Sequence, residues 1–282
     1  MKINYINRKS EILMVTSIIV VFLLSLLAGF KLASQQKSKS SGVYVTDIPV
    51  KIIAHRGSSR RAPENTISSI LCSVEDKADY AELDVQQTKD GVVVLMHDKS
   101  LKRISKLNKN VEETNYKNIE QLSVYANNSK KFRDEKIPKL DEVVKKTKGK
   151  IKLDIEIKSY GNDINLPEKV VKIIEDNNVI DSSMVCSFDY RILEKVKKLN
   201  PKIQIGYITC SNNDDIFKLK DVDFYSVYNA KVDKELIDKV HKRNKKIHVW
   251  TVDNVKDMNK FIEMGVDGII TDYPEKLRAI LM

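Results

Sequence analysis

The feature of this chain that most limits its fold is a regular alternation between short apolar runs and longer amphipathic stretches after residue 48. The short runs have the length and β-branched content of strands, and the longer stretches have the periodicity of helices. The pattern predicts principal strands at 51–55, 80–87, 151–158, 184–188, 204–208, 223–227, 246–251 and 268–271. It predicts helices at 66–76, 139–146, 167–177, 190–199, 214–218, 234–243 and 255–264, and from Pro274 onward. Eight strand–helix repeats are typical of a (β/α)8 TIM barrel, so the predicted fold class is α/β.

Two stretches depart from this alternation. Residues 92–97 read as a short extra strand, and residues 99–137 are polar with weak periodicity. We interpret 99–137 as a small insertion after the second barrel strand. The barrel domain is therefore expected to occupy residues 49–282.

The first part of the chain does not fit a barrel. Residues 1–11 form a short basic tail, and residues 12–30 carry no charge and are rich in Ile, Val, Leu and Phe. As a helix, residues 12–30 would span about 28 Å, close to the roughly 30 Å hydrocarbon core of a bilayer. We therefore predict a transmembrane helix at 12–30 and a flexible tether, rich in Ser, Lys and Gln, at 31–48.

A cleaved signal peptide is the alternative interpretation of this apolar run. The run is longer than the usual 7–15 residues of a signal peptide, and Lys31-Leu32-Ala33-Ser34 is a poor cleavage site, so an uncleaved anchor is favoured. The flanking positive charges are nearly balanced and do not decide the orientation. Because a short tail before a first helix usually stays in the cytoplasm, we expect a single-pass cell-membrane protein whose barrel lies outside the cytoplasm.

The charge of the chain leaves two interpretations open. The chain has 49 Lys and Arg against 39 Asp and Glu, a net charge of +10, and most of its lysines are scattered along predicted helices. This pattern fits a solvated surface, and it also fits attraction to an anionic lipid or polymer. No basic cluster is interleaved with aromatic residues, so nucleic-acid binding is not expected.

Two histidines lie where predicted strands end. His55 and Arg56 follow the apolar run Ile52-Ile53-Ala54, and His97 ends the run that starts at Val92. The carboxyl ends of barrel strands are the usual place for an active site. An imidazole moves protons near neutral pH and a guanidinium grips phosphate through two N–H groups, so the pairing suits phosphate chemistry.

Carboxylates share a face on two of the predicted strands. Glu82 and Asp84 are two residues apart, as are Asp154, Glu156 and Lys158 on a later strand, so each set points to one side. A polar face inside an apolar strand is costly unless it faces an open site. Neighbouring carboxylates repel one another unless a cation lies between them, and a hard divalent metal is the natural partner.

Together these segments resemble the glycerophosphodiester phosphodiesterase family. The shared motifs are His-Arg-Gly at 55–57 with Pro-Glu-Asn-Thr at 63–66, Glu-Leu-Asp-Val at 82–85, Val-Leu-Met-His-Asp at 94–98, Ile-Glu-Ile-Lys at 155–158, Val-Trp-Thr-Val at 249–252 and Gly-Val-Asp-Gly-Ile-Ile-Thr-Asp-Tyr-Pro at 265–274. They occur in order, without a large gap, over about residues 51–282, and the resemblance implies the same TIM barrel. One departure is Asp253, where many members have Asn, and we expect it to tune the mouth of the site without abolishing activity.

The resemblance implies a role for each candidate residue. Glu82, Asp84 and Glu156 would bind one divalent metal ion, Ca²⁺ or Mg²⁺, and His55 and His97 would be the general acid and base in an undecided order. Arg56 and Lys158 would neutralise the phosphate, and Trp250 and Phe188 would line the glycerol side of the pocket. The alternatives are an ion pair of Glu156 with Lys158 or Arg56, and a core position for Trp250.

The implied activity is metal-dependent hydrolysis of small glycerophosphodiesters to sn-glycerol 3-phosphate and an alcohol, in lipid metabolism. A second possibility keeps the fold and the metal but takes lysophospholipids, in the manner of a lysophospholipase D, or glycerophosphate polymers. A third is a catalytically silent binding domain on a membrane stalk. That reading is disfavoured because no histidine or metal carboxylate of the family pattern is missing.

Overall fold

A computed structural model describes residues 50–124, 130–132, 134–160 and 165–282. The predicted tail at 1–11, transmembrane helix at 12–30 and tether at 31–48 lie outside the described residues. Within the described ranges, every helix is too short or too polar to cross a membrane.

The described chain alternates strands with helices, as the sequence pattern predicts. The strands are β1 (Lys51–Ala54), β2 (Tyr80–Gln87), β3 (Val93–Leu95), β4 (Lys152–Ile157), β5 (Ser183–Ser187), β6 (Gln204–Thr209), β7 (Phe224–Tyr228), β8 (Lys246–Trp250) and β9 (Gly268–Thr271). The helices that follow them are α2 (Ile67–Glu75), α5 (Leu140–Thr147), α6 (Leu166–Asp176), α7 (Tyr190–Leu199), α8 (Lys234–His241), α9 (Val255–Met264) and α10 (Pro274–Leu281). The predicted helix at 214–218 is a 3₁₀ turn.

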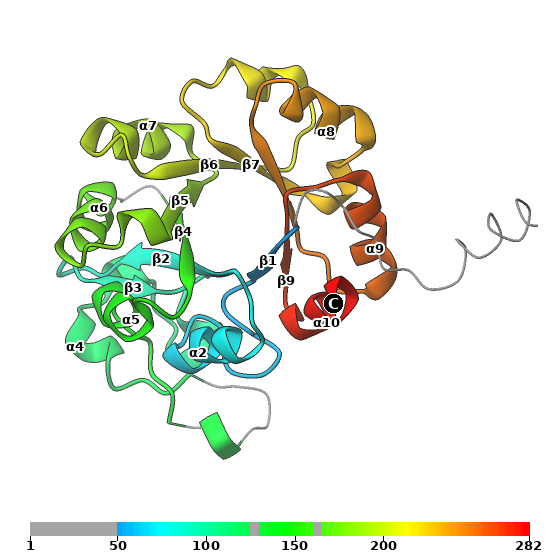
Figure 1. Ribbon diagram of the computed structural model, residues 1–282. Helices are drawn as coiled ribbons and strands as arrows, with labels where there is room; N and C mark the ends of the chain where they lie inside the picture. Colours follow the sequence, from blue (N-terminus) through cyan, green and yellow to red (C-terminus); the bar gives the residue numbers. More distant parts are fainter. Residues whose placement is uncertain (1–49, 125–129, 133, 161–164) are drawn as a thin grey trace, which may run out of the picture. The chain divides into compact units, whose positions relative to one another are not determined.

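The strands close into a barrel. The hydrogen-bonded order is β1-β9-β8-β7-β6-β5-β4-β2-β3, and β1 also pairs with β2, which closes the ring. Only β3 among these strands pairs antiparallel, as a hairpin with β2, so the other eight form a parallel barrel with its helices outside (Figure 1). The predicted TIM barrel is confirmed for the described part of the chain.

The two faces of each strand carry different side chains. On β4, Leu153, Ile155 and Ile157 belong to the core between the barrel and its outer helices. The alternate residues Asp154 and Glu156 point to the other side, toward the barrel interior, because side chains alternate along a strand. The interior also holds a small apolar cluster made of Ile53, Met184, Cys186, Ile208, Phe224 and Ile270.

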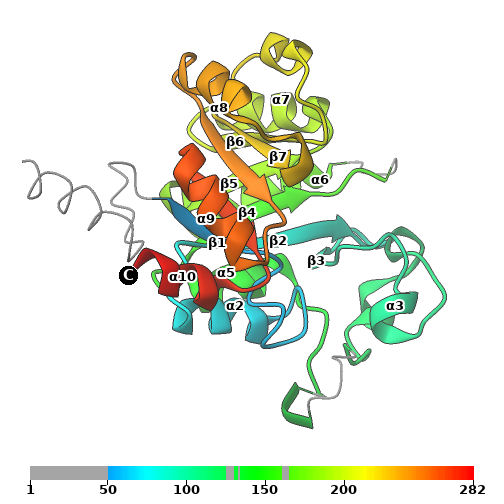
Figure 2. The ribbon, with the colours of Figure 1, turned by 90° about the vertical axis from the view of Figure 1, so that its right-hand side faces the viewer.

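The insertion at 99–137 builds a small core of its own. It contains the short helices α3 (Lys102–Ser105) and α4 (Tyr116–Ile119), and Figure 2 shows α3 on the side of the barrel toward which β2 points. Apolar side chains of the insertion pack with Val94 and Met96 from the end of the β2–β3 hairpin. This packing fixes the insertion beside His97, the residue that follows Met96.

Candidate active site

A cavity lies at the carboxyl ends of the barrel strands and collects the residues that the sequence nominated. It is lined by His55, Arg56, Glu82, His97, Asp154, Glu156, Lys158, Cys186, Phe188, Ile208, Ser226, Trp250, Thr251 and Ile270. Eight of the nine predicted site residues are in this lining. The ninth, Asp84, is buried beside it and contacts Lys158.

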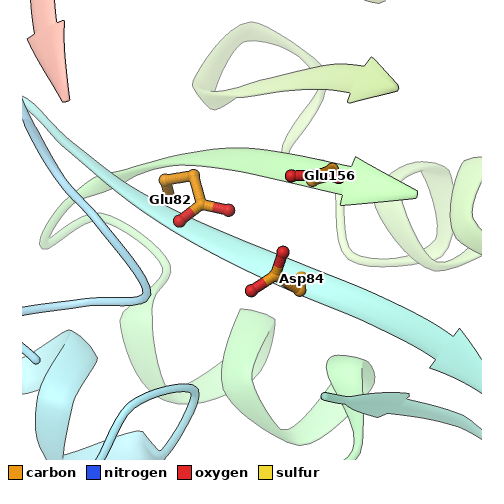
Figure 3. A group of neighbouring side chains, drawn as sticks. All are labelled: Glu82, Asp84 and Glu156. Carbon is orange, nitrogen blue, oxygen red and sulfur yellow. The ribbon is translucent and has the colours of Figure 1, made fainter. Parts of the chain in front are cut away.

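Three carboxylates gather at one side of this cavity. Glu82 and Asp84 come from β2 and Glu156 from β4, where Asp84 and Glu156 are register partners (Figure 3). One oxygen of each lies within 4.8 Å of the others, and all three residues are buried. Burial and the charges of Asp84 and Glu156 raise the pKa of Glu82 well above its usual range. Ionising all three carboxylates in this buried cluster is therefore unfavourable without a further positive charge.

Two cations partly offset this charge. Lys158 Nζ lies 2.6 Å from Glu156 Oε1 and 3.3 Å from Asp84 Oδ1, and Arg56 Nε lies 3.6 Å from Asp84 Oδ2. Burial would raise the pKa of Asp84, but the charges of Lys158, His97 and Arg56 outweigh it and lower the pKa. Burial and Asp84 still raise the pKa of Glu156 to about 7, despite the ion pair with Lys158. The ion pair considered for Glu156 therefore exists, but it does not balance the cluster.

The donor set of the cluster fits a divalent cation. It offers carboxylate oxygens alone, which hard ions such as Ca²⁺ and Mg²⁺ prefer. Three carboxylates face two cationic side chains, so at least one negative charge is left to attract an ion. Glu82, Asp84 and Glu156 are the residues that could hold it.

The loop after β1 holds two of these carboxylates in place. Asn65 donates from Nδ2 to Asp84 Oδ2 at 2.8 Å and accepts from the Asp84 backbone N–H at 3.0 Å. The Arg56 backbone N–H donates to Glu82 Oε2 at 2.6 Å. Asn65 has a left-handed φ of 54°, and Thr66 is the residue that caps α2. The sequence analysis cited Asn65 only as part of the Pro-Glu-Asn-Thr motif, so it missed this contact.

Each histidine is held by a carboxylate at its Nδ1. His55 Nδ1 lies 2.7 Å from Asp272 Oδ1 at the end of β9, and His97 Nδ1 lies 2.8 Å from Asp98 Oδ1. Sequence reasoning did not assign either aspartate, although both lie within the quoted motifs. Burial lowers the pKa of His97, against the opposing charge of Asp84. A carboxylate at Nδ1 leaves Nε2 of each ring for proton transfer with a substrate.

A salt-bridge network ties the insertion to both histidine loops. Arg103 on α3 donates to both oxygens of Asp98 and to both oxygens of Glu64. Glu64 also accepts from Arg56 Nη1 at 2.9 Å. The hydrogen bonds from Arg103 and His97 lower the pKa of Asp98 to about 2, so Asp98 is ionised at neutral pH. The insertion thus supplies a residue of the site that the sequence analysis did not nominate.

Aromatic side chains form another part of the cavity wall. The rings of Phe188 and Trp250 meet edge to face at a centroid distance of 5.8 Å, and Tyr228 lies 5.4 Å from Trp250. Trp250 Nε1 donates to the Ser226 carbonyl at 3.1 Å, while Phe188 remains 45% exposed. Trp250 therefore belongs to the wall of the cavity as well as packing against its neighbours, and Tyr228 packs on Trp250 without lining the cavity itself.

Comparisons with known proteins agree with this geometry. The sequence profile described as the glycerophosphoryl diester phosphodiesterase family matches residues 55–276. A glycerophosphodiester phosphodiesterase of Caldanaerobacter subterraneus is 36% identical over 80% of this chain and 95% of its own length. One from Bacillus altitudinis is 31% identical over 80% of this chain and 96% of its own. In fold, the chain is similar to an Oleispira antarctica phosphodiesterase solved with the product sn-glycerol-3-phosphate, with a TM-score of 0.78, 24% identity, and coverage of 83% of this chain and 97% of that one.

Proposed function

Because the chain belongs to the glycerophosphoryl diester phosphodiesterase family, it is an enzyme that hydrolyses glycerophosphodiesters, and we propose that it does so with one divalent cation and two histidines. The products would be sn-glycerol 3-phosphate and an alcohol, as a step of lipid metabolism. The observation that carries the proposal is the convergence of two carboxylate-held histidines and an acidic cluster on one cavity.

Glu82, Asp84 and Glu156 would hold the cation, which is Ca²⁺ or Mg²⁺. When bound, the cation would polarise a phosphoryl oxygen and offset the negative charge that grows on the phosphate. Arg56 and Lys158 lie at the same side of the cavity and would bind the remaining phosphate oxygens through charge-assisted hydrogen bonds. Trp250 and Phe188 would pack against the glycerol carbons.

The histidines would move the protons of two successive displacements. The glycerol hydroxyl next to the ester attacks phosphorus and gives its proton to one imidazole, while the other imidazole protonates the departing alcohol. This step forms a cyclic phosphate, which water then opens with the roles of the two rings exchanged. General acid–base work of this kind is typically worth about 10²- to 10⁴-fold for each group. Asp98 and Asp272 keep each ring in one tautomer and orientation.

The purified protein tests this proposal. We expect it to release glycerol 3-phosphate from a panel of glycerophosphodiesters, to lose activity on exhaustive chelation and to regain it when Ca²⁺ or Mg²⁺ is added back. An unchanged rate after chelation would contradict the metal proposal. The three carboxylates would then have a structural role. Hydrolysis of lysophospholipids or glycerophosphate polymers at a higher kcat/KM would favour the alternative substrates.

The location of the enzyme is a separate proposal, supported by the uncharged run 12–30 and the lack of a good cleavage site after it. We propose that the chain is anchored in the cell membrane with its barrel outside the cytoplasm. Protease added to intact cells should then remove the barrel while a cytoplasmic marker survives. If the barrel resists the added protease, the barrel lies on the cytoplasmic side. A mature chain that begins after residue 30 would show that the apolar run is a cleaved signal peptide.

A further inference from the structure

Asp154 is a buried carboxylate of the barrel interior that the proposed chemistry does not use. It is fully buried on β4, two residues before Glu156 and on the same face of the strand. Apart from the neighbouring Cys186 thiol, neither of its oxygens has a hydrogen-bond partner among the described residues. Its register partner Glu82 accepts from the Arg56 backbone, and Glu156 has Lys158. Asp154 therefore differs from the carboxylates around it.

The packing around Asp154 does not explain why a carboxylate is there. The neighbouring interior positions hold Met184, its register partner on β5, and the Cys186 thiol. A thiol is only a weak donor, so it does not satisfy two carboxylate oxygens. Burying a polar group without a partner is costly, and an apolar side chain at this position would pack without that cost. A buried acceptor that lacks a donor in the protein is suited to a donor that arrives with a ligand.

Asp154 lines the inner end of the active-site cavity. It shares that end with Ser226 and Ile270, whereas His97, Phe188 and Trp250 line the cavity from the strand ends. Two residues along a strand span about 6.6 Å, so Asp154 lies one such step deeper than Glu156. This spacing is comparable with the length of a glycerol chain. If the phosphate binds beside Glu156, the far end of the glycerol can therefore lie beside Asp154.

We propose that Asp154 accepts a hydrogen bond from the terminal hydroxyl of the glycerol moiety and selects substrates in which this hydroxyl is free. The inference rests on the proposed function and adds a residue that distinguishes between substrates. A free glycerol hydroxyl supplies the missing donor. An acyl ester at that position supplies no donor. Asp154 would therefore favour a glycerol moiety whose terminal hydroxyl is free.

A matched pair of substrates tests this assignment. The first is a glycerophosphodiester, and the second is the same diester with propane-1,2-diol in place of glycerol, which keeps the attacking hydroxyl and lacks only the terminal one. The wild-type enzyme should prefer the first by roughly 10- to 100-fold in kcat/KM, the usual range for one hydrogen bond to a charged group. Equal rates on the two diesters in the wild type would overturn the assignment without any variant.

Two variants locate the preference at Asp154. In Asp154→Leu the preference should shrink to within a few-fold, chiefly because the glycerol diester reacts more slowly. Asp154→Asn keeps an acceptor oxygen and should retain part of the preference. A residue that only supports Glu156 would instead slow both diesters by the same factor, and that result would refute the assignment.

Thermal unfolding gives a readout that does not depend on turnover. Because Asp154 has no partner among the described residues other than the weak donor Cys186, Asp154→Leu should unfold at the same or a higher temperature than the wild type. A marked fall in Tm together with equal loss on both diesters would assign Asp154 to the structure of the barrel. If the wild type cleaves neither diester, the proposed function itself fails, which is a different result from equal cleavage of both.

Discussion

His55 and Asp272 are joined by a 2.7 Å contact between Nδ1 and Oδ1, although 217 positions separate them in the chain. The contact forms because β1 and β9 are neighbours in the barrel, with Ala54 and Thr271 in register. Asp272 also accepts from Ser59 Oγ at 3.0 Å, and its backbone N–H donates to Asp253 Oδ1 at 2.9 Å. Ser59 therefore holds the carboxylate that orients His55, and Asp253 holds the backbone that carries it.

We predict that Asp272→Asn lowers kcat by roughly 10²-fold or more, because an amide does not hold the His55 ring in one tautomer. The folded structure should survive, so circular dichroism and Tm should change little. Asp253→Asn is the matched control, since an amide oxygen can still accept from the Asp272 backbone, and it should retain activity within a few-fold. Full activity in Asp272→Asn would remove the dyad from the mechanism.

Loss of either histidine should nearly abolish turnover. His55→Ala and His97→Ala are each expected to reduce kcat by about 10²- to 10⁴-fold. The double variant should lose much less than the product of the two effects, because both rings serve one proton-transfer cycle. Steady-state kinetics on one diester measures all three proteins, and near-full activity in a single variant would exclude that ring from the chemistry.

Metal affinity should depend on Glu156. Glu156→Gln removes one of three carboxylate charges, so calorimetry with Ca²⁺ or Mg²⁺ should show at least a roughly 10-fold weaker affinity, and turnover should fall with it. Glu168→Gln is the matched control, because Glu168 pairs with Lys195 away from the cavity. Unchanged metal affinity in Glu156→Gln would place the ion elsewhere.

His248 should make the fold less stable in acid. It is 4% exposed inside the barrel, its ring packs on Phe224 at 4.6 Å, and burial lowers its pKa to about 4. Because the unfolded chain binds the proton near pH 6.5 and the folded chain does not, the free energy of unfolding should fall between about pH 6.5 and pH 4. The gap of about 2.5 pKa units corresponds to roughly 3 kcal/mol.

Denaturant unfolding of the wild type and His248→Asn at pH 7.5 and pH 5 measures this contribution. The variant should be less stable overall, since it leaves space beside Phe224, but its stability should fall less between the two pH values. The comparison isolates His248, because raised carboxyl pKa values at Glu156 and Asp154 act in the opposite direction in both proteins. Equal pH dependence in the two proteins would show that His248 does not titrate as expected.

The pattern of the chain was sufficient to predict the barrel because strands buried on one face and helices with one apolar stripe have distinct periods. The same period-two rule placed Glu82 with Asp84 and Glu156 with Lys158 on inward faces, as the structure confirms. The first strand ends at Ala54, so His55 lies in the following turn and not within the strand.

Contacts between distant segments were beyond the reach of the pattern. Nothing near His55 in the sequence indicates Asp272, and Arg103 reaches Glu64 only because the insertion folds back. Asp154 was visible as an inward residue, but its lack of a partner is a property of the packed barrel. Propensity and spacing describe single elements, whereas these features depend on which elements become neighbours.

The pairing of the first strand with the last also bears on biosynthesis. A ribosome makes β9 after all the other strands of the barrel, so one edge of β1 has no partner until β9 has emerged. His55 likewise has no Asp272 until the residue after β9 has emerged. A nascent chain would therefore be inactive until β9 is made, and truncation within β9 would remove catalytic competence along with barrel closure.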